Sequence, residues 1–185
     1  MESIRVKDLM VPVEEYVTIS ATATLYEAVI KLEQAQRDYE QKKCPHRALL
    51  VLGTSGEVIG RMNKIDVIRS LEPKYVELGD LRKVSGFGLA PEFMKAMMDK
   101  FELWETPLND LCRKSADVKV GDLVATPLEG EIIDSEDTLN KAVHQIIVGH
   151  KQSLIVKSGG KIVGILRLTD VFDEIAKRMR LCKIQ

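Results

Sequence analysis

The sequence predicts an α/β protein made of two copies of a β-α-β-β-α unit with a helical insertion between them. Residues 56–67 and 160–171 both read Gly-x-x-x-Gly-x-x-x-x-x-Asp-Val on one hydrophobic framework. Upstream, Asp-Leu-Met at 8–10 matches Asp-Leu-Val at 122–124. Two pairs of matching segments in the same order indicate an internal repeat, and this repeat is the main support for the predicted fold class.

The two copies differ in length at one place. Thr24 and Thr138 match at a distance of 114 positions, whereas Asp66 and Asp170 match at a distance of 104. The first copy therefore carries ten extra residues, which fall within residues 28–48. Because this stretch is charged and rich in glutamine, we predict a longer first helix with a solvated outer face.

Local chemistry predicts the order of elements within each copy. Runs of β-branched residues favour strands, stretches rich in glycine and serine favour turns, and apolar residues at helical spacing favour helices. In the first copy we predict a strand at 17–19, a helix from 24, a strand at 48–52, a turn at 53–56, a strand at 58–62 and a helix from about 65. In the second copy we predict a strand at 132–133, a helix at 138–148 that Gly149 ends, a strand at 154–156, a turn at 157–160, a strand at 162–166 and a helix from 170.

Between the copies, residues 72–117 are expected to form a mostly helical arm. Pro91 suits the first turn of a helix, and the residues after it place a broad apolar face at helical spacing. That face consists of Phe93, Met94, Met97, Met98 and Phe101. It must be covered either by the protein's own helices or by another chain, and the sequence leaves both outcomes open.

Composition narrows the classes of function. Hydrophobic residues make up 45% of the chain, but no apolar run approaches the ~20 residues of a membrane-spanning helix, so we expect no membrane partner. The charged start of the chain predicts no targeting segment and hence a cytoplasmic location. A net charge of −1 offers no broad attraction for nucleic acid, so no nucleic-acid partner is expected.

The cysteines and the known catalytic motifs point away from metal binding and catalysis. Cys44, Cys112 and Cys182 are widely spaced and odd in number, so we predict free thiols and no metal site. Cys112 is predicted to be a small buried hydrophobic residue beside Leu108 and Leu111. Walker, Gly-x-Ser-x-Gly and His-Glu-x-x-His patterns are not recognisable, so we predict that the protein is not an enzyme and requires no cofactor.

The repeat order and the Gly-x-x-x-x-x-Asp ending of each copy resemble the cystathionine β-synthase (CBS) domain, whose tandem pair is called a Bateman module. The resemblance covers residues 4–71 as a first CBS unit and residues 118–180 as a second. It implies a stand-alone module in which the units are related by a pseudo-two-fold axis with two clefts between their sheets. It also implies a regulatory role, since clefts of this family commonly hold adenine nucleotides or adenosyl compounds.

The resemblance also implies roles for residues of the repeated motif. In the family pattern Gly-x-x-[Ser/Thr]-x-x-Asp, the aspartate, here Asp66 or Asp170, accepts hydrogen bonds from ribose hydroxyls. The hydroxyl position departs from the pattern, because it holds Asn63 in the first copy and Arg167 in the second. Asn63 can still form hydrogen bonds, whereas Arg167 either grips a phosphate or fills the cleft. The alternative role for each aspartate is to cap the helix that follows.

Basic residues precede the central strand of each copy at matching positions. His46 and Arg47 lie 104 positions before His150 and Lys151. The resemblance implies that they contact ligand phosphates; alternatively, they end the preceding helix and point outward. With two threonines added, the candidate ligand-binding residues are Thr18, His46, Arg47, Asn63, Asp66, His150, Lys151, Arg167, Thr169 and Asp170.

Two functions from different classes remain. The first is a regulatory sensor that binds AMP, ADP, ATP or S-adenosylmethionine and acts through dimerisation or a separate effector protein. The second is a ligand-free dimeric scaffold or protein-interaction module whose clefts are closed by Arg167 and its neighbours. Both include a homodimer, because modules of this family resemble one another in pairing through their helices.

Overall fold

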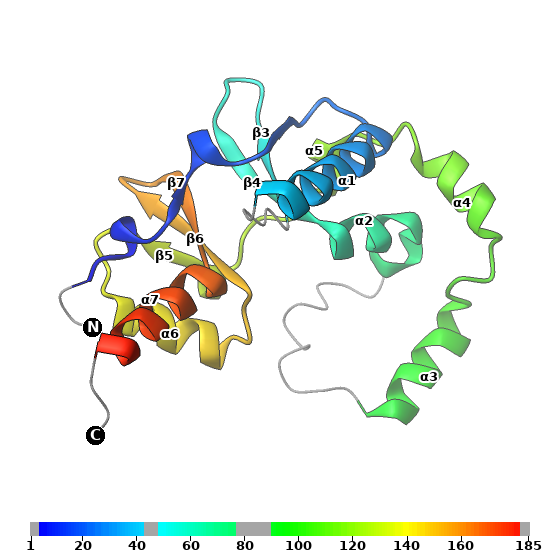
Figure 1. Ribbon diagram of the computed structural model, residues 1–185. Helices are drawn as coiled ribbons and strands as arrows, with labels where there is room; N and C mark the ends of the chain where they lie inside the picture. The colour runs from blue at the N-terminus through cyan, green and yellow to red at the C-terminus, as the bar shows by residue number, and fades with distance from the viewer. Residues whose placement is uncertain (1–3, 43–47, 77–89, 182–185) are drawn as a thin grey trace. The chain divides into compact units, whose positions relative to one another are not determined.

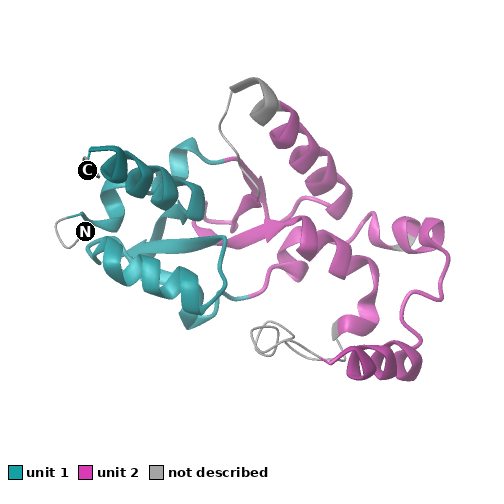
Figure 2. Ribbon diagram, turned by 60° about the horizontal axis from the view of Figure 1, so that its bottom comes forward, with its two compact units in different colours: residues 1–16, 126–185 teal, residues 17–125 magenta. Residues whose placement is uncertain are grey.

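The computed structural model describes residues 4–42, 48–76 and 90–181 (Figure 1). Contacts between residues divide the chain into two compact units, one of residues 1–16 with 126–185 and the other of residues 17–125 (Figure 2). Each unit contains one β-α-β-β-α repeat, so the duplicated α/β fold predicted from the sequence is confirmed.

The unit of residues 17–125 is built on a three-stranded sheet in the order β2-β3-β4. Its elements are β2 (Thr18–Ser20), α1 (Leu25–Lys42), β3 (Ala48–Leu52), β4 (Val58–Asn63), α2 (Lys64–Leu71), the 3₁₀ turn η3 (Pro73–Val76), α3 (Pro91–Phe101), α4 (Leu108–Ser115) and α5 (Val120–Leu123). β2 runs parallel to β3, and β3 runs antiparallel to β4. Leu25, Ala28 and Leu32 of α1 form a buried cluster with Leu49 and Met62 of the sheet. Their spacing of three and four residues places them on one helix face, so a mostly polar helix can still dock there.

Helix α1 begins with a capping box. The Thr24 hydroxyl accepts a hydrogen bond from the Glu27 backbone N–H at 3.2 Å, and the Glu27 carboxylate accepts one from the Thr24 N–H at 2.7 Å. The bond from the Thr24 backbone, followed by one from its hydroxyl, lowers the pKa of Glu27. α1 has 18 residues against 10 in its counterpart α6 (Leu139–Val148), so the longer first helix is confirmed.

The unit of residues 1–16 and 126–185 is built on a four-stranded sheet in the order β1-β7-β6-β5. Besides α6, its elements are η1 (Val6–Asp8), β1 (Val11–Pro12), η2 (Val13–Glu15), η6 (Glu129–Glu131), β5 (Ile132–Asp134), β6 (Ser153–Ser158), β7 (Lys161–Arg167) and α7 (Leu168–Leu181). β6 and β7 form a hairpin whose two central residues, Gly159 and Gly160, have φ values of 56° and 81°. Two successive positive φ values are typical of a two-residue hairpin turn and favour glycine at both positions.

The segment that leads into each repeat packs with the other repeat. β1 pairs antiparallel with β7, and the matching segment α5 forms hydrogen bonds with the loop before α1. A Cβ added to Gly164 would lie 2.6 Å from the Val11 carbonyl oxygen, and one added to Gly60 would lie 2.5 Å from Cγ1 of Val124. The close approach of the lead segment therefore explains the second glycine of the repeated pattern.

A buried carboxylate anchors the arm to its unit. Glu72 is 3% exposed and accepts hydrogen bonds from the backbone N–H groups of Lys74 at 3.2 Å and of Trp104 at 2.9 Å. The Trp104 indole N–H donates to the Tyr75 hydroxyl at 3.1 Å, and the two rings meet edge to face. These contacts hold the segment between α3 and α4 against η3.

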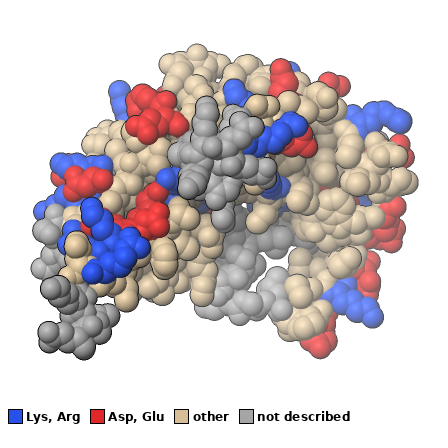
Figure 3. Space-filling view, viewed as in Figure 1, with Lys and Arg blue, Asp and Glu red and all other residues tan. Residues whose placement is uncertain are grey.

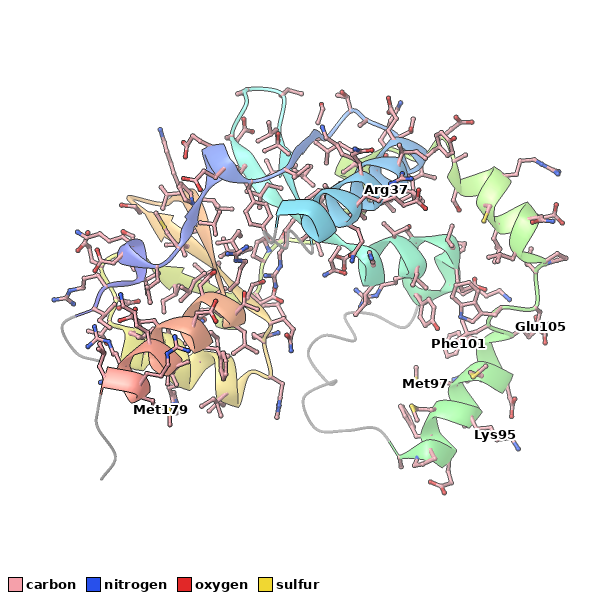
Figure 4. The ribbon with its side chains drawn as sticks, viewed as in Figure 1. Arg37, Lys95, Met97, Phe101, Glu105 and Met179 are labelled. Carbon is pink, nitrogen blue, oxygen red and sulfur yellow. The ribbon has the colours of Figure 1, made fainter. Side chains whose placement is uncertain are left out.

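The apolar face of α3 remains largely exposed. Phe93, Met94 and Met98 are 53%, 47% and 51% exposed, and no residue of this fully described helix is buried. Met97 and Phe101 lie further along the same helix (Figure 4). The described residues of the chain therefore do not bury this face.

Helix α4 overturns the prediction for Cys112. Its thiol is exposed rather than buried, and Leu108 is also 58% exposed. Leu111 is the one of these three residues that is buried, at 5% exposure. Because successive helical residues lie about 100° apart, a helix that turns Leu111 inward carries Cys112 toward solvent.

Candidate functional site

At one end of the three-stranded sheet, β2 and β3 begin and β4 ends. This first sheet end carries the candidate residues Thr18, Asn63 and Asp66. Asn63 caps α2, because its Oδ1 accepts hydrogen bonds from the backbone N–H groups of Ile65 at 2.8 Å and of Asp66 at 3.1 Å. In return, the Asp66 carboxylate accepts the Asn63 backbone N–H at 2.8 Å. This reciprocal capping box pairs amides that the helix itself leaves unpaired, and it fixes the carboxylate in the first turn.

The corresponding end of the four-stranded sheet, where β5 and β6 begin and β7 ends, carries Glu131, Lys151, Arg167 and Asp170. At this second sheet end Arg167 occupies the position of Asn63, but a guanidinium has no acceptor with which to cap a helix. It forms a two-pronged ion pair instead, in which Nε donates to Oδ2 of Asp170 at 2.6 Å and Nη2 donates to Oδ1. The Arg167 backbone N–H also donates to Oδ2, at 3.3 Å. The two side chains are only 15% and 16% exposed, so the ion pair is largely shielded from water.

A second ion pair lies at the same sheet end. Lys151 Nζ is 3.4 Å from Glu131 Oε1, and the two side chains are 22% and 9% exposed. Glu131 also accepts the backbone N–H of Leu128 through Oε2 at 3.1 Å. The sequence did not identify Glu131, because it lies 20 positions from Lys151 within a short polar Glu-Gly-Glu stretch. The parallel pairing of β5 with β6 is what brings the two residues together.

His150 lies in the turn that ends α6. Its N–H donates to the Ile147 carbonyl at 3.2 Å, and the Lys151 N–H donates to the Ile146 carbonyl at 3.0 Å, which are the paired bonds of a Schellman motif. Gly149 ends the helix as predicted, but its φ is −83°. The left-handed position that usually holds glycine is filled by His150, which has a φ of 47° and an exposed side chain.

Two of the remaining candidate residues lie in the part of the chain that the structure describes. Thr18 is half-buried in β2, and Thr169 is exposed in the first turn of α7. His46 and Arg47 lie outside the described residues. The structure therefore joins Asn63 with Asp66 in one unit, and Arg167 with Asp170 in the other.

Charges at the second sheet end are already neutralised by each other. Two cations are paired with two carboxylates there, Lys151 with Glu131 and Arg167 with Asp170. On the face seen in Figure 3, basic and acidic side chains are interspersed. Within the described ranges, no group of three or more His, Cys, Asp or Glu could hold a metal ion, and no helix is long and apolar enough to cross a membrane.

Comparison with known proteins identifies both repeats. The family model of the CBS domain matches residues 6–73 and 120–177. No curated protein sequence matches the chain.

Several solved structures share the fold. A CBS-domain-containing protein of unknown function from Bacillus anthracis is 16% identical with a TM-score of 0.63, and the match covers 96% of each chain. CBSX2 in complex with AMP is 17% identical with a TM-score of 0.56, and the match covers 96% of this chain and 100% of that one. CbpB in complex with c-di-AMP is 13% identical with a TM-score of 0.59, and the match covers 97% of this chain and 89% of that one. At these identities the similarity is one of fold.

Proposed function

Because this chain belongs to the CBS-domain family, we propose that it is a non-catalytic regulatory module that binds adenine nucleotides at its sheet ends. The observation that carries the proposal is the repeated placement of an aspartate, Asp66 or Asp170, in the first turn of the helix that follows each β-hairpin. A carboxylate there can accept hydrogen bonds from ribose hydroxyls. The helix N-terminus adds partial positive charge that favours a nearby phosphate.

Two structures with a similar fold support the choice of ligand class. CBSX2 was solved with AMP and CbpB with c-di-AMP. Both compounds combine adenine, ribose and phosphate, whereas S-adenosylmethionine carries no phosphate. We therefore place phosphorylated adenosine ligands ahead of S-adenosylmethionine in the proposal.

The alternative function is a ligand-free dimeric scaffold or protein-interaction module. It is favoured by the two ion pairs at the second sheet end, which satisfy Asp170 and Lys151 without any ligand. Under this alternative, the charged groups at the second sheet end serve to stabilise the fold and bind nothing.

A melting-temperature screen against AMP, ADP, ATP, c-di-AMP and S-adenosylmethionine separates the two functions. A ligand at ~100 times its dissociation constant should add about 2.7 kcal/mol to the free energy of unfolding, which is about 5–10 °C for a chain of this length. In calorimetry, Asp66→Ala or Asp170→Ala should weaken binding on the order of tenfold to a hundredfold. Asp99→Ala, on the exposed helix α3, is the matched control. If no compound shifts the melting temperature, the sensor is rejected and the scaffold takes its place.

We also propose that the protein acts as a homodimer, with a separate effector protein as the alternative partner. Large apolar side chains are exposed on three helices, namely Ile65 and Ile68 on α2, Phe93, Met94 and Met98 on α3, and Phe172 and Met179 on α7. A stable interface covers well over ~1,000 Å², and a second copy offers the same apolar helices in return. Analytical ultracentrifugation that finds a monomer at high protein concentration would contradict the homodimer.

A further inference from the structure

We propose that helix α2 couples nucleotide binding at the first sheet end to the docking of the arm, so that a bound nucleotide loosens the contact between Glu72 and Trp104. This inference rests on the proposed function, because it concerns how the protein responds to a ligand at Asp66. The residues that carry the coupling all belong to one compact unit, residues 17–125. The arm between the two repeats is then the part of the protein that changes when the ligand binds.

Helix α2 joins the candidate ligand site to the anchor of the arm. It follows Asn63, whose capping box holds the Asp66 carboxylate in the first turn. Glu72 comes directly after its last residue, and the Glu72 backbone N–H donates to the Arg69 carbonyl at 3.3 Å. A helix of this length spans about 12 Å. Because its backbone hydrogen bonds make it stiff, a shift of the first turn also moves Glu72.

Helix α2 is held loosely by the rest of its unit. None of its residues is buried, and Ile65 and Ile68 are 66% and 55% exposed. Val67 and Leu71 are only partly buried where they pack against the core. A helix with so little buried surface can shift as a rigid body, because few packing contacts are lost. A hydrogen bond from a ligand hydroxyl to Asp66 is therefore able to displace α2.

The backbone that receives the shift is strained. Trp104 has a φ of 63° and Glu102 a φ of 48°, values that residues other than glycine rarely adopt. Both residues are held by the segment that follows α2. The buried Glu72 carboxylate accepts the Trp104 backbone N–H at 2.9 Å, and Lys74 Nζ donates to the Glu102 carbonyl at 2.9 Å. Strained backbone persists only where its neighbours hold it, so displacement of Glu72 lets Trp104 relax away from the anchor.

The other end of the arm is tied to a different element. The arm continues into α5, where the backbone N–H groups of Val120 and Gly121 donate to the carbonyls of Ala23 and Ala21, both at 2.8 Å. These carbonyls belong to the loop before α1, so a movement of α2 does not carry α5 with it. The displacement is therefore taken up at the anchor of the arm.

Fluorescence of Trp104, the single tryptophan, tests the coupling during titration with AMP. Binding should shift the emission to longer wavelength, because a displaced indole is more exposed to water. At the AMP concentration that saturates the parent, Asp66→Ala should lose most of this shift, because it weakens the ligand at the first sheet end. Glu105→Ala is the matched control, since Glu105 is an exposed glutamate next to Trp104 and is labelled in Figure 4. Its emission should shift as that of the parent does.

Reciprocity gives a second test that does not depend on fluorescence. If AMP loosens the anchor, a variant whose anchor is already loosened should bind AMP more tightly, by about fivefold or more. Isothermal titration calorimetry of Glu72→Ala measures this gain. Tyr75→Phe removes only the hydroxyl that accepts the Trp104 indole N–H at 3.1 Å, so it should give a smaller gain in the same direction and does not remove the buried carboxylate. Glu105→Ala should bind AMP with the affinity of the parent.

The two tests separate the coupling from nucleotide binding itself. If calorimetry detects AMP bound to the parent while the emission stays unchanged or moves to shorter wavelength, the coupling is overturned and the proposed function stands. The coupling is also overturned if Asp66→Ala keeps the full shift, or if the variants at Glu72 and Tyr75 that fold by circular dichroism bind AMP no more tightly than the parent. If the parent binds no adenine nucleotide in calorimetry or in the melting-temperature screen, the coupling and the proposed function both fail.

Discussion

Replacing Gly164 by alanine tests whether the close approach of β1 explains the repeated glycine. The added Cβ would lie 2.6 Å from the Val11 carbonyl oxygen and 2.9 Å from Met10 Sδ, so β1 has to move away from β7. Overpacking of this kind costs about 1–3 kcal/mol, and the upper half of that range applies because a backbone atom cannot rotate aside. For a chain of this length, a loss of about 2–3 kcal/mol lowers the melting temperature by about 4–12 °C.

Urea denaturation followed by circular dichroism measures this loss against two related variants. Gly130→Ala is the control, because nothing lies within 4 Å of its added Cβ. The loss in the free energy of unfolding for Gly60→Ala should lie between those of Gly164→Ala and Gly130→Ala. The Cβ added at Gly60 meets the side chain of Val124, which can change rotamer. If the free energy of unfolding of Gly164→Ala equals that of Gly130→Ala within error, the packing explanation is refuted.

Three further predictions concern the capping box of α1, the Glu72 carboxylate that anchors the arm, and the left-handed backbone conformation of His150. Because the pKa of Glu27 is lowered in the folded state, its contribution to stability is complete above its ordinary pKa of 4.5 and is lost as the pH falls through the lower folded pKa. Glu27→Gln should therefore reduce the fall in the free energy of unfolding over that acidic pH range. Urea denaturation at a series of pH values measures this fall, and the same dependence on pH in the variant and the parent would contradict the capping box. Glu72→Ala should lower the free energy of unfolding by about 1–3 kcal/mol and shift the emission of Trp104, the single tryptophan, to longer wavelength; an unchanged spectrum argues against the anchor. His150→Gly should raise the free energy of unfolding by up to about 1 kcal/mol, because glycine adopts a positive φ without steric cost, and thermal denaturation checks the sign.

Much of the fold could be predicted because its signals are local. The strands, the hairpin turns and the longer helix α1 follow from side-chain chemistry within a few residues, and the structure confirms them. The prediction that Cys112 is buried was wrong, because burial is decided by distant parts of the chain and not by local signals. In a short helix such as α4, the pattern of Leu108, Leu111 and Cys112 does not decide which residue faces inward, because the packing surface beneath it is made of distant parts of the chain.

The candidate site could be predicted in part. The positions of Asp66 and Asp170 after each hairpin were evident from the repeat, and their place in a first helical turn follows from local structure. The role of Arg167 stayed open, because a long flexible side chain reaches several partners and the sequence does not rank them. Glu131 was missed entirely, since nothing near it in the sequence distinguishes it from a solvated loop residue.

By itself, the sequence determined the duplication, the element order and the pair of repeated aspartates. Tertiary structure alone decided that each lead segment packs with the opposite repeat and that Glu131 meets Lys151. The physical reason is the range of the forces involved. Periodicity and turn chemistry act over a few residues and leave a pattern in the sequence. Strand pairing and the ion pair between Glu131 and Lys151 depend instead on which distant segments the sheet brings into register.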